Sequence, residues 1–303
     1  MTKLIHEKRL YRDYPLLSRL EWHFSRSRYF AYVMDHYVAK MRFRWHNWRR
    51  RRRLVPSSLM HFEAKVFSQN GEDGILREIF ARIGEGEKYF VEFGIEDGSE
   101  CCTRNLLMNQ GWTGLLLEGS PARAEKARAL YGEFGGVRVE QAFITAENIL
   151  ELFGKYGVPA SPDLLVVDVD GNDYWLLERI LSRYQPRVIV CEYNARWAPA
   201  MDWVMPYDAS HVWEGSAYYG ASLAALCRLA ASQSCKLVCC DSHGVNAFFV
   251  RGDLLGDRFP DHQLGVAHYV PPHFGRGYGH PIRTRPGLAF HKRFLRKNTG
   301  TKA

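Results

Sequence analysis

The chain has 303 residues, of which 46% are hydrophobic and 14% aromatic, and this content excludes a disordered protein. Its net charge of +8 is uneven, because residues 1–53 carry 15 Lys and Arg against 4 Asp and Glu while the remainder is slightly acidic. No apolar run approaches the ~20 residues of a membrane-spanning helix, and seven cysteines without paired CxxC spacing predict free thiols in a reducing cytosol.

The first 60 residues form a basic arm in which Arg and Lys are mixed with aromatic residues, and it ends near Pro56 after the run Arg49 to Arg53. This composition predicts one or two amphipathic helices. Scattered charges near the N-terminus disfavour a secretory signal. We expect a cytoplasmic protein whose arm contacts the inner face of a membrane. A homo-oligomer interface and nucleic-acid binding are alternatives, the latter disfavoured because no recognisable RNA-binding fold accompanies the arginines.

Residues 61–260 alternate between strand and helix patterns, beginning with a helix at 71–83. Short apolar runs bounded by turn residues predict parallel strands at 89–94, 114–118, 137–143, 164–168 and 188–192. Helices are expected between them, at 100–109, 121–132, 146–155 and 173–184. Strands separated in this way form a parallel sheet with helices on both faces.

An irregular insert at 195–221 and a helix at 222–234 follow the fifth strand. The strands expected at 236–240 and 246–251 are close enough to form an antiparallel hairpin. We therefore predict an α/β domain with a seven-stranded, mostly parallel sheet that ends in an antiparallel hairpin. Residues 261–303 are expected to form a loop or lid.

Acidic side chains and glycines follow the predicted strands, at the edge where open α/β sheets bind ligands. Glu92, Gly94 and Gly98 end the first strand, and Glu118 ends the second, 24 residues beyond Gly94. An acid at this distance can accept both ribose hydroxyls. No GxGxxG motif for a pyrophosphate is present, and carboxylates suit a sulfonium cation better. The pattern favours S-adenosylmethionine over a dinucleotide.

Six stretches resemble the FkbM-like family of class I S-adenosylmethionine-dependent methyltransferases, which have a Rossmann-like fold. They are residues 68–73, 91–100, 111–119, 167–174, 191–195 and 246–250, and the resemblance covers about residues 66–255. It implies that Glu92, Gly94 and Gly98 hold the methionine end of the cofactor and Glu118 the ribose. The other residues that it places beside the cofactor are Gln69, Ala142, Phe143 and Asp168. Glu96 departs from the family, replacing the usual middle glycine of the turn.

Transfer of a methyl group to a hydroxyl requires a general base or a metal ion. Asp168 and Asp170 are two residues apart, so they point the same way if the segment is extended. The candidate catalytic residues are Asp170, Asp173, Glu192 and His243. The candidate ligands for Mg2+ are Asp170, Glu192 and Asn194, since this ion prefers carboxylate and amide oxygens. The simpler interpretation is that Asp173 caps the next helix and no metal binds.

The family resemblance implies O-methylation of a sugar hydroxyl in a glycan or glycolipid. In the insert, His211 and the pair Tyr218-Tyr219 are candidates to line the acceptor pocket, with packing as the alternative role for the aromatic residues. One alternative is a catalytically silent module whose arm binds membrane or nucleic acid. Another is O-methylation of a small natural product. The position of Glu96 distinguishes an active enzyme from the silent module, because a side chain that blocks the cofactor pocket would favour the silent module.

Overall fold

The computed structural model describes residues 56–260 and 266–273, together with residues 38, 41, 43–45, 47–49, 52 and 54. The chain divides into two compact units. One contains the described helical residues between 38 and 49, and the other contains the α/β body. No helix among these residues is long and apolar enough to cross a membrane.

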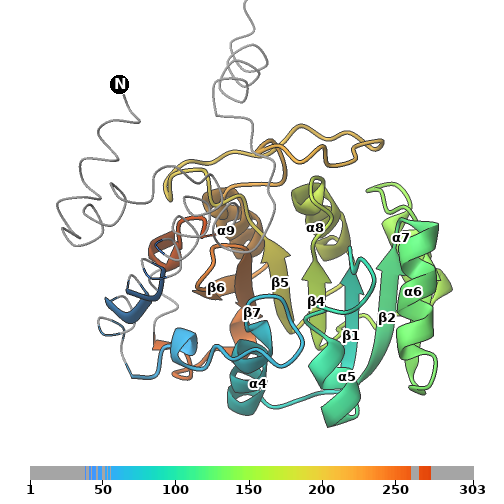
Figure 1. The fold of residues 1–303 in the computed structure, drawn as a ribbon, viewed down its shortest axis with the longest axis horizontal. Coiled ribbons are helices and arrows are strands. Elements are labelled where there is room, and N and C mark those ends of the chain that lie inside the picture. The colour runs from blue at the N-terminus through green and yellow to red at the C-terminus, as the bar shows by residue number, and fades with distance from the viewer. Residues whose placement is uncertain are drawn as a thin grey trace, which may run out of the picture. The chain divides into compact units, whose positions relative to one another are not determined.

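The body is built on a seven-stranded sheet with the order β3-β2-β1-β4-β5-β7-β6 (Figure 1). The strands are β1 Tyr89–Phe93, β2 Thr113–Glu118, β3 Val137–Gln141, β4 Leu164–Val167, β5 Val188–Glu192, β6 Cys235–Cys240 and β7 Asn246–Arg251. The first five are parallel, and β7 pairs antiparallel with both β5 and β6. This order confirms the predicted Rossmann-like class I methyltransferase fold.

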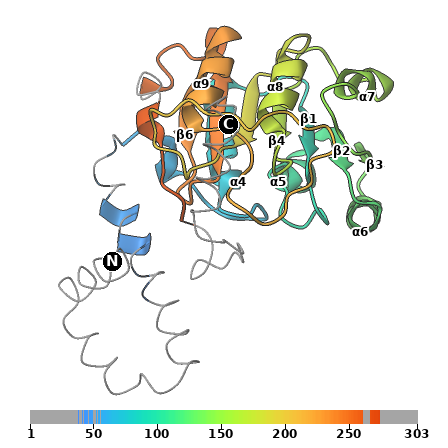
Figure 2. The same cartoon turned by 90° about the horizontal axis from the view of Figure 1, so that it is seen from above.

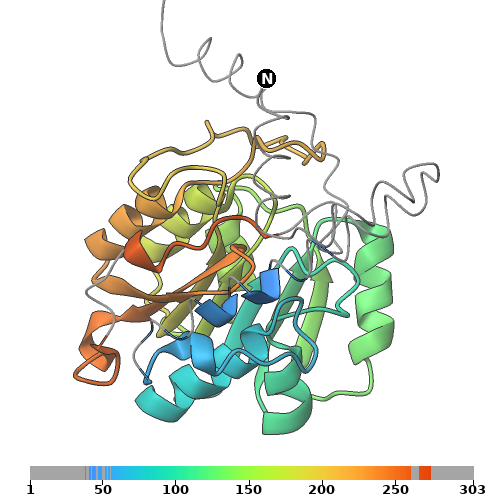
Figure 3. The same cartoon turned by 60° about the vertical axis from the view of Figure 1, so that its left-hand side comes forward.

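Three helices cover each face of the sheet, as Figures 2 and 3 show from two further directions. One layer contains α4 Glu72–Ile83, α5 Arg104–Gln110 and α6 Pro121–Tyr131. The other contains α7 Ile149–Lys155, α8 Asp173–Leu181 and α9 Leu223–Ser232. Successive strand residues enter opposite cores, so that Leu116 packs under the first layer and Leu115 and Leu117 under the second. Burial on both sides explains why these strands are continuous apolar runs.

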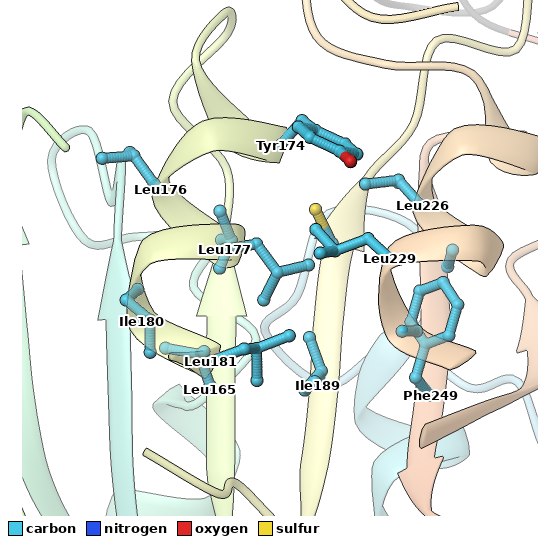
Figure 4. Close-up of a cluster of buried hydrophobic side chains, with 14 of the residues drawn as sticks. Leu165, Tyr174, Leu176, Leu177, Ile180, Leu181, Ile189, Leu226, Leu229 and Phe249 are labelled. Atoms are coloured by element: carbon cyan, nitrogen blue, oxygen red, sulfur yellow. The ribbon is translucent and has the colours of Figure 1, made fainter. Parts of the chain in front are cut away.

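The core under α8 and α9 holds the sheet at its centre. Leu177 of α8 and Leu226 of α9 point toward Leu165 and Ile189 of the central strands (Figure 4). These side chains are almost completely buried, and full burial of each contributes about 1.5–3 kcal/mol. The packing fixes the strand ends that carry the polar residues.

Residues outside the regular elements also pack on the body. The insert at 195–221 has no strand beyond the isolated bridge between Val204 and Ala221, as expected for an irregular segment. From the predicted loop or lid, the described residues 266–273 lie against β5 and the β6–β7 turn. The Tyr193 hydroxyl donates to the Val270 carbonyl, and the His273 amide donates to the His243 carbonyl.

The segment before α4 is pressed onto the helix at Gly74. A Cβ at this glycine would lie 2.0 Å from the carbonyl oxygen of Phe62, although Gly74 has an ordinary helical backbone. The Gly74 amide donates to the Ala64 carbonyl, which fixes the same contact. Gly154 in α7 offers a matched comparison, since nothing lies within 4 Å of the corresponding position.

We expect Gly74→Ala to lower the free energy of unfolding by about 2 kcal/mol or more, because the new methyl group overlaps backbone that cannot retreat. Gly154→Ala should instead raise it by up to about 1 kcal/mol, the usual gain in helix propensity. Urea unfolding of both variants checks this pair. Equal effects would show that residues 62–64 do not dock on α4.

Candidate functional site

The turn after β1 touches the loop after β4, and a glycine makes this possible. Gly94 has a φ of +78°, and a Cβ there would lie 1.4 Å from the carbonyl oxygen of Asp168. Gly98, with a φ of +82°, is pressed against Tyr131 of α6, whose hydroxyl donates to the Gly98 carbonyl. Both predicted glycines are therefore required by close approach and by backbone conformation.

The backbone conformation at Glu96 explains why the related family has a glycine at this position. Its φ is +52°, in the left-handed region that side chains rarely adopt. The side chain is 69% exposed and pairs with Arg123 of α6 at 3.2 Å. Glu96 therefore keeps the turn of a glycine and points toward solvent, where an exposed ion pair adds little stability.

Glu92 is buried at the end of β1 and organises the start of α5. Its carboxylate accepts hydrogen bonds from the amides of Cys102 and Thr103 and from the Thr103 hydroxyl. Burial raises the pKa of Glu92 to about 7, while these donors oppose the shift. The structure shows that Glu92 holds the 101–103 segment, and its contact with the methionine end of a cofactor stays a prediction.

Glu118 lies buried between the loops that follow β1 and β2. One carboxylate oxygen accepts from the Glu96 amide at 2.9 Å and the other from the Ser120 amide at 2.8 Å. The Glu118 carbonyl accepts from the Ala142 amide, and Phe143 is exposed with its ring beside Gly119. The residues predicted for ribose and adenine therefore lie next to one another at the sheet edge.

Gln69 lies in a turn before α4 that is held by two buried acids. Asp73 accepts from the amides of residues 66–68 and from the Ser68 hydroxyl. Glu72 accepts from the Asn70 amide and from the Asn246 side chain of β7. The turn is thus tied to the body, and contact between Gln69 and a cofactor stays a prediction.

Three carboxylates meet where β4 and β5 end. One oxygen from each of Asp168, Asp170 and Glu192 lies within 4.8 Å of the others. Burial is the main cause that raises the pKa of each, and repulsion from neighbouring carboxylates, Asp173 among them, adds to it; the pKa of Asp170 rises to about 7. No described residue donates to the buried Oε2 atom of Glu192. The group can accept a cation or a proton.

The predicted reason for this convergence was wrong. β4 ends at Val167, and Asp170 has a φ of +55°, so the two aspartates do not lie on one extended segment. They meet because the chain turns back on itself. Asp173, predicted as catalytic, stabilises this turn: its carboxylate oxygens accept from the amides of Val169 and Gly171. This corrects its role to a positioning one.

The predicted metal ligands also need a correction. Asn194 is fully buried, and its amide donates to the carbonyls of Ala217 and Tyr219 while its oxygen accepts from the Arg196 amide. It therefore anchors the insert. Asp168 is the third side chain that the structure brings to Asp170 and Glu192.

His243, the alternative base, lies in a second group with Glu63 and Asp241. Burial and the neighbouring His273 lower the pKa of His243 to about 4, so its imidazole is a weak base. The Asp241 carboxylate accepts backbone amides from residues 243–246 and closes the β6–β7 turn. The structure thus places His243 in this turn, and its role as a base stays a prediction. Glu63 had no sequence signal that linked it to this turn.

His211 of the insert packs against the loop after β4. A Cβ at Gly171 would lie 2.2 Å from Cδ2 of His211, although Gly171 does not have a positive φ. A side chain at position 171 would therefore require the imidazole to move. The Nε2 atom of His211 is buried and has no hydrogen-bond partner among the described residues.

We expect the free energy of unfolding to fall as the pH rises from about 5 to 8. The folded state keeps a proton on Glu92 up to a pKa of about 7, against 4.5 when unfolded, so its contribution is full at low pH and is lost on raising the pH. The effect is at most roughly 3 kcal/mol.

Glu92→Gln should be less stable at pH 5, because the amide accepts fewer hydrogen bonds, and its stability should depend less steeply on pH. Urea unfolding of both proteins between pH 5 and 8 measures the two slopes. Identical slopes would contradict protonation of this buried acid.

The chain was compared with protein families, with curated proteins and with solved structures. Residues 79–215 match the family model described as the Methyltransferase FkbM domain. None of the curated proteins compared with the chain matches it significantly.

Solved structures resemble the chain weakly. The citrinin polyketide synthase CMeT domain is 10% identical, with a TM-score of 0.39, covering 59% of this chain and 51% of that one. The Methanococcus jannaschii fibrillarin pre-rRNA processing protein is 10% identical, with a TM-score of 0.39 and coverage of 60% and 76%. The METTL16 MTase domain is 14% identical, with a TM-score of 0.38 and coverage of 59% and 66%.

The chain spans about half the length of the first solved structures that it matches, the CMeT domain among them. Such TM-scores do not support a functional assignment, which therefore depends on the family model, the sheet order and the residues at the strand ends. The family identification is the match of residues 79–215 to the Methyltransferase FkbM domain, and the sheet order agrees with it.

Proposed function

We propose that the chain is an S-adenosylmethionine-dependent methyltransferase that binds its cofactor where β1 lies between β2 and β4. The observation that carries this proposal is the position of Glu118. Its buried carboxylate is fixed by two backbone amides beside the Gly94 turn and next to Phe143. Ligands of open α/β sheets bind at this switch in strand order, and the acid after the second strand accepts the ribose hydroxyls.

The orientation of Glu96 favours an enzyme over a silent module. A side chain that pointed toward Glu118 would hinder the cofactor, but Glu96 is mostly exposed and pairs with Arg123. Its backbone amide, rather than its side chain, contacts Glu118. The departure from the family motif is therefore compatible with a ligand at Glu118.

The acceptor in this proposal is a hydroxyl group, on a sugar of a glycan or glycolipid. In methyl transfer the acceptor oxygen bonds to the methyl carbon as the carbon–sulfur bond breaks, and the hydroxyl proton goes to a base. Asp170 suits this role because its pKa of about 7 lies near the working pH, as general-base catalysis requires. Burial is the main cause of that raised pKa, and repulsion from Asp173 and Glu96 adds to it.

A divalent cation also fits these residues, and the proposal includes Mg2+ at this position. Asp168, Asp170 and Glu192 supply three carboxylate oxygens, which hard cations prefer, and Oε2 of Glu192 lacks a donor. Bound there, the ion would lower the pKa of the acceptor hydroxyl. Without it, the carboxylates themselves would accept the proton.

Glu118→Ala should weaken binding of S-adenosylhomocysteine by roughly 10- to 100-fold, the usual effect of losing hydrogen bonds to a charged group. Isothermal titration calorimetry measures this loss, and thermal unfolding shows whether the variant is folded. Glu118→Gln, which keeps the shape, should also bind more weakly. Glu125→Ala, an exposed acid of α6, is the matched control and should bind normally.

No binding of S-adenosylhomocysteine to the wild-type chain would refute the enzyme proposal itself. Binding that survives both substitutions at Glu118 would refute only the ribose role of this residue.

Mg2+ or Mn2+ should raise the thermal unfolding temperature of the wild-type chain in a saturable manner, because a ligand of the folded state stabilises it. Asp170→Asn and Glu192→Gln should lose this response and keep their affinity for S-adenosylhomocysteine. Differential scanning fluorimetry with a metal series measures it, again with Glu125→Ala as the control. An unchanged response in Asp170→Asn would place the cation elsewhere.

A further inference from the structure

An exposed apolar stripe runs along the described helical part of the arm. Val38, Met41, Trp45 and Trp48 follow one another at intervals of three and four residues, which places them on one helix face. Met41 is 50% exposed, Trp45 42% and Trp48 51%. Two half-exposed tryptophans and a methionine on one face are unusual for a surface in contact with water alone.

Basic side chains accompany the stripe. The guanidinium of Arg49 lies 4.5 Å from the ring centre of Trp45, and the run of arginines from Arg49 to Arg53 follows directly in the sequence. Tryptophan at the boundary between apolar tails and headgroups, flanked by Arg and Lys, is the pattern of a helix that lies in a membrane interface.

We propose that this helix binds the surface of a membrane that contains anionic lipids, with Met41, Trp45 and Trp48 inserted between the acyl chains and the arginines on the headgroups. The proposal does not depend on the methyltransferase function. Each basic residue near an anionic surface strengthens binding roughly fivefold. The net charge of +11 over residues 1–53 matches such a surface.

The composition of the stripe favours lipid over nucleic acid. Arginine and tryptophan can both bind RNA, through phosphates and base stacking. Val38 and Met41 offer no ring for stacking, but acyl chains accept them as readily as tryptophan. An apolar face that contains both aliphatic and aromatic side chains therefore fits a bilayer better than it fits RNA.

The test is sedimentation of the full chain with lipid vesicles. Vesicles of phosphatidylcholine with about 30% phosphatidylglycerol should bind the chain at least roughly tenfold more strongly than phosphatidylcholine alone. Raising the salt from about 0.1 to 0.5 M should weaken that binding, since the headgroup contribution is screened.

Substitutions separate insertion from charge attraction. Trp45→Ala combined with Trp48→Ala should reduce vesicle binding roughly tenfold or more at constant charge. Met201→Ala with Val212→Ala removes two exposed apolar side chains of the insert and should leave binding unchanged. Arg49→Gln with Arg52→Gln should remove most of the preference for anionic lipid. Thermal unfolding of each variant shows that the α/β body is intact.

Three results would overturn the proposal. The first is wild-type vesicle binding by the double tryptophan variant, which would leave charge attraction alone. The second is binding of a single-stranded RNA oligonucleotide without binding to vesicles. The third is self-association that depends on Trp45 and Trp48, detected by light scattering, without vesicle binding.

Discussion

The missing side chain of Gly94 is the constraint on which the candidate site depends. Without a Cβ at this position, the turn after β1 lies directly on the carbonyl of Asp168, so the loops of two neighbouring strands share one surface. The Glu96 amide then reaches Glu118, and the chain beyond Asp168 turns back to bring Asp170 beside Glu192. A single backbone contact thus positions both the residues proposed for the cofactor and those proposed for the acceptor.

The acids at this edge work against the stability of the fold. Glu92 is buried and Asp168, Asp170 and Glu192 are half-buried, and desolvation raises the pKa of each. A protein that needed only a stable core would place apolar side chains there. Their retention is consistent with a ligand that brings positive charge, such as the proposed sulfonium and divalent cation, which would relieve the repulsion on binding.

The sequence was sufficient to predict the strands, their succession along the chain and the residues that follow them, because apolar runs and the spacing from Gly94 to Glu118 are local patterns. It could not show that Asn194 anchors the insert, that Asp173 accepts backbone amides, or that Glu63 meets Asp241. Each of these depends on the three-dimensional path of a loop, and the last joins residues 178 positions apart. Asp170 reached its predicted neighbour through a left-handed turn, a conformation that its residue type does not reveal.

The contact between Gly171 and His211 couples the insert to the loop after β4. The imidazole occupies the space where a side chain at position 171 would place its first carbon, so a substitution there would displace His211. A change in the loop that carries Asp170 would therefore be transmitted to the insert, and residues 171 and 211 should vary together rather than independently.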